Sequence, residues 1–219
     1  VMKNILSQIS TFSQTRFAVW IINKKSMLGL KLPTDPRWAD LAAISVQAIL
    51  TDHAYCEQKA AISMISLIQS YPEEIRVVDE LAPVVTEEWG HFRAVLAMLK
   101  KRGLLLGPQR RDDYVNKLKA FERHGGDRHS QLVEKLLIFA LIEARSCERF
   151  RVLSVHLDDD ELKEFYHGFM VSEAGHYRMF LDLAHLFGEK EVVKARWQEF
   201  LDYEETIMND LAVRGDRIH

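Results

Sequence analysis

Residues 88–93 read Glu-Trp-Gly-His-Phe-Arg, and residues 173–178 read Glu-Ala-Gly-His-Tyr-Arg. The two segments share the pattern Glu-x-Gly-His-aromatic-Arg and begin 85 residues apart. Residues three apart on an α-helix project from neighbouring positions of one face, so the Glu and His of each copy can reach a common ion. The repeat therefore predicts two similar long helices, each presenting a Glu-His pair to a shared core.

Four-helix bundles build two-metal sites from two such Glu-x-x-His pairs and one further Glu from each of the two other helices. Two glutamates occupy the matching places, because Glu57 precedes Glu88 by 31 residues and Glu143 precedes Glu173 by 30 residues. A carboxylate on an apolar helix face is costly unless a cation compensates it. Two divalent irons would offset four negative charges and leave positions open for dioxygen. We therefore predict a metal site with six ligands, which are Glu57, Glu88, His91, Glu143, Glu173 and His176.

Two further glutamates compete for places in this set. Glu148 follows a cysteine as Glu57 does, but arginines at positions 145 and 151 flank it, so we favour Glu143 and keep Glu148 as the alternative. Glu87 stands one helical turn before the histidine of the first motif, yet the second motif has Ser172 there. The repeat therefore selects the motif glutamate over Glu87.

The remaining histidines and the basic residues give weaker signals. His53, one turn before Glu57, either lines the metal site or is a partly buried core histidine. We assign no role to His124, His129, His156, His167 and His185. A basic group comprises Lys100, Lys101, Arg102, Arg110 and Arg111. Cations at a helix end complement its dipole, and the alternative reading is a phosphate-contacting patch.

The spacing of apolar residues predicts an all-helical chain with scarce glycine and proline at the helix ends. We expect helices over residues 37–70, 72–102, 112–123, 127–156, 158–187 and 191–213, with Pro83 kinking or restarting the second. Four of these are at least 30 residues long, the length scale of a helical bundle. The predicted fold is a ferritin-like four-helix bundle with additional helices.

We expect one domain over residues 1–219. Residues 1–36 would cover the bundle, residues 37–187 would form its core, and a C-terminal helix would span 191–213. Within residues 1–36, a helix is suggested by Ile5, Ile9 and Phe12, and the apolar run 17–22 is undecided.

Composition and charge narrow the class of protein. An apolar fraction of 47% is that of an ordinary globular protein, and a net charge of −3 argues against wholesale coating of nucleic acid. No apolar stretch is long enough to span a membrane, and no signal peptide is recognisable, so we expect a cytoplasmic protein without membrane contact. Cys56 and Cys147 have neither metal-site nor redox-pair spacing and are expected to be reduced, buried thiols.

Three segments resemble one family of enzymes. The duplicated motif, residues 141–150 (Leu-Ile-Glu-Ala-Arg-Ser-Cys-Glu-Arg-Phe) and residues 52–60 (Asp-His-Ala-Tyr-Cys-Glu-Gln-Lys-Ala) look like the bacterial tRNA hydroxylases acting on 2-methylthio-N6-isopentenyladenosine. The resemblance extends from about Leu32 to the last residue. It implies a non-haem di-iron monooxygenase that uses dioxygen and an external electron donor, such as a reductase, to hydroxylate the isopentenyl side chain next to the tRNA anticodon.

The resemblance also implies that the six predicted residues are iron ligands, and the tRNA partner rests on it alone. Other readings of the same site are a rubrerythrin-like peroxidase, a manganese catalase and a non-enzymatic iron-storage protein. The chain lacks the paired Cys-x-x-Cys knuckles of a rubredoxin domain, which weakens the first. The bound metal would test the second, and assembly size the third, because storage requires a large hollow shell whereas we expect a monomer or small oligomer.

Overall fold

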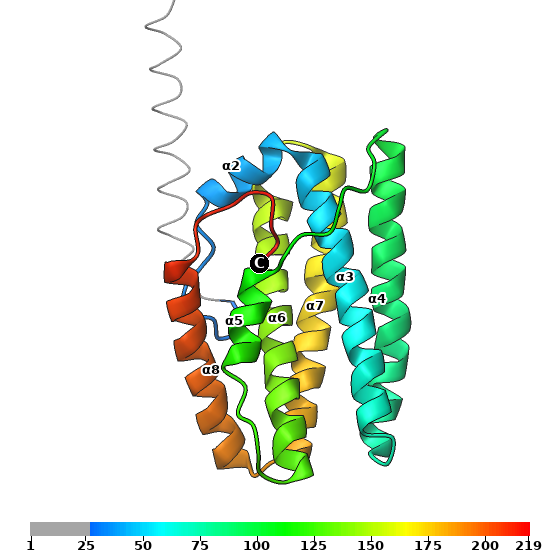
Figure 1. Ribbon diagram of the computed structural model, residues 1–219. Helices are drawn as coiled ribbons and strands as arrows, with labels where there is room; N and C mark the ends of the chain where they lie inside the picture. The colour runs from blue at the N-terminus through cyan, green and yellow to red at the C-terminus, as the bar shows by residue number, and fades with distance from the viewer. Residues whose placement is uncertain (1–26) are drawn as a thin grey trace, which may run out of the picture.

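The computed structural model describes residues 27–219, which form seven α-helices and no strand (Figure 1). The helices are α2 (Arg37–Ile44), α3 (Val46–Ser70), α4 (Ile75–Lys101), α5 (Asp113–Ala120), α6 (Arg128–His156), α7 (Asp160–Phe187) and α8 (Lys190–Asp210). The long helices α3, α4, α6 and α7 run side by side as a four-helix bundle. Helix α2 crosses one end of the bundle, and α5 and α8 lie along its outer side. The predicted all-α bundle with additional helices is confirmed.

The bundle is built from two tightly packed helix pairs, α3 with α4 and α6 with α7. Its apolar interior forms two clusters, one at each end of the long helices. Along α6, for example, Leu136 and Leu141 belong to one cluster, whereas Phe150 and Leu153 belong to the other. The polar layer that holds the candidate site lies between them, so packing on both sides fixes the helices that carry it.

The predicted helix over residues 37–70 is wrong in one respect, because it is broken at Ser45. This residue leaves the helical conformation (φ −138°, ψ 81°), and its side chain accepts a hydrogen bond from the N–H of Ala48 at 3.3 Å. A serine that caps the next helix competes with continuing the previous one. Two helices, α2 and α3, therefore replace the single predicted one.

The second helix begins at Ile75, three residues later than predicted, and runs through Pro83 without restarting. Pro83 is exposed, so water can solvate the carbonyl one turn earlier that loses its partner. Asp127 and Asp159 cap α6 and α7 as expected, accepting hydrogen bonds from the N–H groups of Ser130 and Leu162.

Helix α8 ends at Asp210, three residues earlier than predicted, and the chain then folds back over the bundle. The indole of Trp38 donates to the carbonyl of Arg217 at 3.0 Å, and the N–H of Ile218 donates to Asp52 at 2.8 Å. These contacts hold the tail in an extended path and bring His219 onto helix α6.

We expect residues 1–36 to cover the bundle, but residues 1–26 of this segment lie outside the described residues. Over residues 27–219, no helix combines the length and the apolar character needed to cross a membrane. Both cysteines are free thiols; Cys147 is buried, and Cys56 is half-buried.

Candidate metal centre

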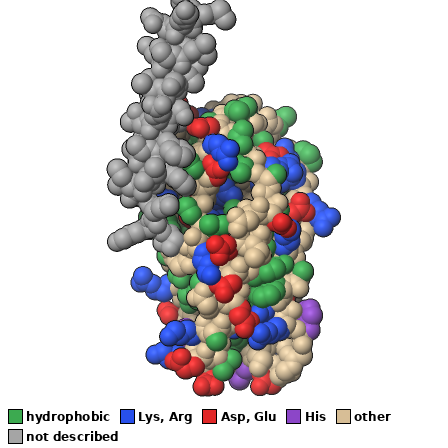
Figure 2. All heavy atoms as spheres, turned by 90° about the vertical axis from the view of Figure 1, so that its left-hand side faces the viewer, with side chains coloured by type: hydrophobic (Ala, Val, Ile, Leu, Met, Phe, Trp, Pro, Cys, Tyr) green, Lys and Arg blue, Asp and Glu red, His purple; other side chains and the backbone are tan. Residues whose placement is uncertain are grey.

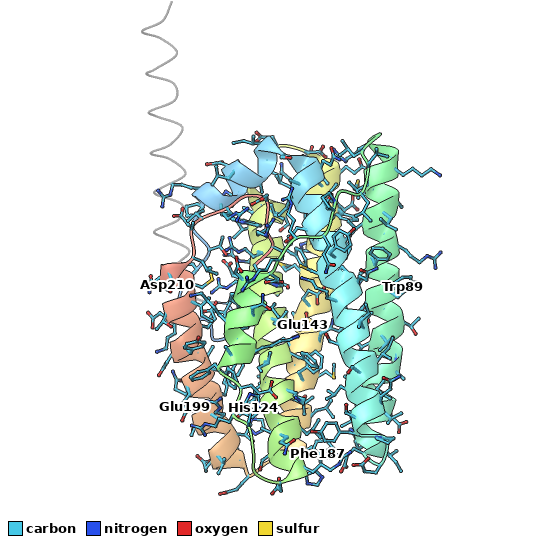
Figure 3. All side chains as sticks on the ribbon, in the orientation of Figure 1. Trp89, His124, Glu143, Phe187, Glu199 and Asp210 are labelled. Carbon is cyan, nitrogen blue, oxygen red and sulfur yellow. The ribbon has the colours of Figure 1, made fainter. Side chains whose placement is uncertain are left out.

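The structure brings all six predicted residues together in the middle of the bundle. Their ligand atoms form two groups, each with all atoms within 4.8 Å of one another. One group is Glu57, Glu88, His91 and Glu173, and the other is Glu88, Glu143, Glu173 and His176. Glu88 and Glu173, the glutamates of the two repeated motifs, belong to both groups. Figure 3 shows Glu143 inside the bundle, among the four long helices.

The local sequence explains this convergence. In each motif the Glu and His stand three residues apart on α4 or α7 and share the face turned to the core. Glu57 and Glu143 lie on α3 and α6, the partners of α4 and α7 in the two helix pairs. Four buried carboxylates and two imidazoles thus meet between two apolar clusters.

Electrostatics make this cluster costly without a cation. Burial, followed by repulsion from the neighbouring carboxylates, raises the pKa values of Glu57 and Glu143 well above the ordinary range. Burial also opposes charge on His176, yet its proximity to Glu173 and Glu88 raises the pKa of this imidazole to about 12. The same imidazole, with that of His91, holds the pKa of Glu88 below its usual value despite burial.

Several polar atoms of the cluster are buried without a hydrogen-bond partner in residues 27–219. They include Glu88 Oε1, Glu173 Oε1, His91 Nδ1 and His176 Nε2. Glu88 Oε1 lies only 2.8 Å from His176 Nδ1, but the pair lacks hydrogen-bond geometry. Three of these atoms, Glu88 Oε1, Glu173 Oε1 and His91 Nδ1, lie within the cluster, whereas His176 Nε2 faces Glu87. Carboxylate and imidazole donors in this arrangement fit divalent transition metals such as iron.

His53 joins the site from α3. It is fully buried, and its Nε2 lies 2.7 Å from Glu57 Oε1. The rings of Phe150 and Phe169 pack against it at centroid distances of 4.6 and 4.5 Å. Burial holds the pKa of His53 well below its usual value, so the ring is neutral. His53 is therefore both a buried core histidine and a neighbour of a candidate ligand.

The two competing glutamates lie outside both four-residue groups. Glu148 is buried, but its oxygens contact Arg145 at 3.4 Å, Arg151 at 3.3 Å and the N–H of Thr34 at 3.1 Å. Glu87 is half-exposed on α4, next to the two histidines. Glu88 and Glu143, which we preferred on the repeat and on the helix face, thus belong to the cluster, whereas Glu87 and Glu148 do not.

The other histidines and the basic group stay apart from the cluster. None of the five histidines without an assigned role belongs to a potential metal group in the described part of the chain; His124, for instance, lies between α5 and α6 (Figure 3). Four of the five basic residues form ion pairs with acidic side chains. On the face seen in Figure 2, acidic and basic side chains are interspersed. These pairings do not favour a dedicated phosphate patch at residues 100–111.

A cavity of ≈ 170 Å³ leads from the protein surface to the carboxylate side of the cluster. Its inner wall includes Glu57, Glu88, Glu143 and Glu173, and its flanks are largely apolar, with Ala60, Met64, Phe139 and Ile142. Lys59, Lys119 and His219 also line it, whereas His91 and His176 do not. The cavity therefore reaches the four carboxylates but not the two motif histidines.

One residue of the cavity wall, His219, could not be predicted from the sequence. Its ring stacks on Tyr114 at 5.2 Å, and its Nε2 lies 2.9 Å from the hydroxyl of Ser146. It reaches the cavity because the tail folds back, a long-range contact that local patterns do not encode.

Comparison with known proteins identifies the family. Residues 21–219 match the family model described as tRNA-(MS[2]IO[6]A)-hydroxylase (MiaE). The tRNA 2-(methylsulfanyl)-N(6)-isopentenyladenosine(37) hydroxylase of Pseudomonas putida is 37% identical, over 78% of this chain and 86% of that protein. The protein of the same name from Salmonella typhimurium is 27% identical, over 86% of this chain and 85% of its own length.

A solved structure shares the fold. It is described as Protein 43 with aldehyde deformylating oxygenase activity from Synechococcus, is 31% identical and superposes with a TM-score of 0.81. The alignment covers 87% of this chain and 94% of that one. On the family match and the level of identity to the Pseudomonas protein, this chain belongs to the tRNA-(MS[2]IO[6]A)-hydroxylase (MiaE) family.

Proposed function

We propose that this protein is a di-iron monooxygenase that hydroxylates the isopentenyl side chain of 2-methylthio-N6-isopentenyladenosine in tRNA, next to the anticodon. The observation that carries the proposal is the pair of four-residue groups that share two glutamates at the inner wall of an apolar cavity. The names of two relatives, which specify hydroxylation of this nucleoside, supply the substrate.

The composition of the two groups suggests how the ligands divide between the ions. Glu88 and Glu173 belong to both groups and would help to hold both irons. Glu57 and His91 would complete the ligands of one iron. Glu143 and His176, the equivalent residues in the other half of the repeat, would complete the ligands of the second iron. Each iron would then have three carboxylates and one imidazole, a donor set that suits Fe(II) and leaves coordination positions open.

When bound, the two irons would supply the activation of dioxygen and the insertion of one of its oxygen atoms into a C–H bond. The second oxygen atom leaves as water, so the reaction consumes two electrons from an external donor, which we expect to be a reductase. The carboxylates would keep the ions together, and the ring of His53, whose Nε2 lies 2.7 Å from Glu57 Oε1, would pack against that carboxylate.

The cavity accounts for substrate choice. Ala60, Met64, Phe139 and Ile142 offer an apolar channel suited to a branched five-carbon group. Because the glutamates lie at the inner end of the cavity, a prenyl group that enters it would bring its allylic carbons next to the metal site.

The remainder of the substrate would stay outside the cavity. Lys59 and Lys119 line its wall on α3 and α5, where ammonium groups can meet the tRNA backbone. Lys59 is held by Asp112 at 3.0 Å, and Lys119 is exposed. A tRNA substrate also places the reaction in the cytoplasm.

The test is nucleoside mass spectrometry of prenylated tRNA after incubation with iron-loaded, chemically reduced protein and dioxygen. The proposal predicts a gain of one oxygen atom on the prenylated adenosine, and no gain with Glu57→Ala or Glu143→Ala variants that remain folded. An unchanged nucleoside with fully iron-loaded wild-type protein would refute it, as would full activity in either variant.

A further inference from the structure

The outward-facing nitrogens of the two motif histidines converge on one side chain. His91 and His176 turn their Nδ1 atoms to the carboxylate cluster, 3.3 Å from Glu57 Oε2 and 2.8 Å from Glu88 Oε1. Their Nε2 atoms face Glu87 instead: Oε1 lies 3.8 Å from His91 Nε2, and Oε2 lies 3.3 Å from His176 Nε2. A single carboxylate thus faces both rings, one oxygen to each.

Glu87 is held in this place from the opposite helix. The hydroxyl of Ser172 on α7 donates a hydrogen bond of 2.5 Å to Glu87 Oε1 on α4. Ser172 occupies in the second motif the position that Glu87 occupies in the first, so the two equivalent residues of the repeat contact each other. Because the two motifs differ at this position, Ser172 can donate and Glu87 can accept, whereas two glutamates here would repel each other.

A histidine that binds a metal through Nδ1 carries its proton on Nε2. An acceptor for this N–H fixes the tautomer, orients the ring and strengthens the metal bond. His176 Nε2 is buried and has no hydrogen-bond partner over residues 27–219, and Glu87 Oε2 is the carboxylate oxygen that stands 3.3 Å away. The two histidines have two Nε2–H groups in all, and the Glu87 carboxylate has two oxygens, so each N–H group has one oxygen that faces it.

We propose that Glu87 is a shared positioning residue, whose two oxygens accept the Nε2–H groups of both histidine ligands while Ser172 clamps it. The proposal rests on the metal centre proposed above. Glu87 does not line the cavity. Its substitution therefore acts on metal binding and not on entry of the substrate.

The informative variant is Glu87→Gln, which keeps size and the contact with Ser172 but offers one acceptor and one donor group to two N–H donors. Glu80→Gln is the matched control, since Glu80 is a partly exposed glutamate on the same helix that pairs with Arg76 at 3.0 Å. Metal-free full-length proteins would be titrated with Co²⁺ without oxygen, after circular dichroism has established that each is folded.

Two readouts follow from the titration. Glu87→Gln is expected to bind Co²⁺ about 10–100-fold more weakly than wild type, whereas Glu80→Gln binds as wild type does. In proton NMR spectra of the cobalt-loaded proteins, the shifted imidazole N–H signals of Glu87→Gln should exchange faster with water, a change that a merely structural role would not produce. Ser172→Ala should show a smaller effect in the same direction.

The outcomes separate this proposal from the proposed function. Wild-type affinity and wild-type N–H exchange in Glu87→Gln would overturn the role of Glu87 and leave the metal centre standing. A wild-type protein that binds no cobalt at all would overturn both.

Discussion

Glu143 and Glu148 are buried on one helix five residues apart, and replacing each with glutamine should change stability in opposite directions. Glu143 is 5% exposed, and its pKa is raised by burial and then by repulsion from Glu173 and Glu88. In the metal-free protein at pH 7.5, keeping such a carboxyl neutral costs at most about 4 kcal/mol, at 1.36 kcal/mol for each pH unit above its value of 4.5 in the unfolded chain. Glu143→Gln removes this cost, and we expect the metal-free protein to gain about 2–4 kcal/mol.

Glu148→Gln should have the reverse effect. Glu148 is 1% exposed and contacts Arg145 and Arg151 at 3.4 and 3.3 Å, so a neutral side chain weakens charge-assisted contacts. We expect a loss of about 1.5–3 kcal/mol. Urea unfolding of the metal-free proteins at pH 7.5, followed by circular dichroism, measures both changes.

The two variants should also differ in metal content. Glu143→Gln removes a ligand of one four-residue group and should retain one of two ions in equilibrium dialysis, whereas Glu148→Gln should retain both. The gain in stability of Glu143→Gln should shrink toward pH 5, because a raised carboxyl pKa stabilises the fold at low pH and destabilises it as the pH rises. A metal-free Glu143→Gln protein less stable than wild type, or one that binds two ions with unchanged affinity, would refute this reasoning.

Three further predictions concern the metal, the cavity and the outer helices. Ferrous iron at about 100 times its dissociation constant at pH 8 should stabilise the protein against thermal unfolding by about 2.7 kcal/mol per ion, and the same iron concentration should stabilise it less at pH 6, because Glu57 and Glu143 must lose their protons to bind the metal; an unchanged melting temperature would contradict this. Ala60→Leu narrows the cavity and should slow hydroxylation roughly tenfold or more, a barrier increase of about 1.4 kcal/mol, with two irons still bound; equal single-turnover rates would exclude the cavity as the substrate path. Glu134→Ala removes the buried partner of Arg196 at 2.7 Å and leaves this guanidinium with Glu199, so it should cost about 1.5–3 kcal/mol in urea unfolding while metal content stays unchanged; a loss below 1 kcal/mol would show that the buried pair contributes little.

The carboxylate-histidine cluster could be predicted from the sequence because its geometry is local to each helix. A spacing of three places each Glu-His pair on one face, and the repeat located the second pair and the two core-face glutamates. Glu143 could be preferred to Glu148 because the arginines flanking Glu148 in sequence also contact it in the fold.

Other features depend on contacts between distant segments, which periodicity does not reveal. The break at Ser45 depends on a side-chain cap that competes with a continuous apolar pattern. Glu87 was set aside because the repeat has serine in its place, yet that serine is what holds it beside both histidines. His219 reaches the cavity only because the tail folds back over Trp38 and Asp52.

The central claim is that the carboxylate-histidine cluster of this chain inserts an oxygen atom from dioxygen into the prenyl group of a tRNA nucleoside. The most direct test is a single turnover of the iron-loaded, reduced protein with prenylated tRNA under ¹⁸O₂, followed by mass spectrometry of the released nucleosides. We predict one ¹⁸O atom in the isopentenyl side chain. A hydroxyl group that carries oxygen from water, or an unmodified nucleoside at full iron occupancy, would contradict the account.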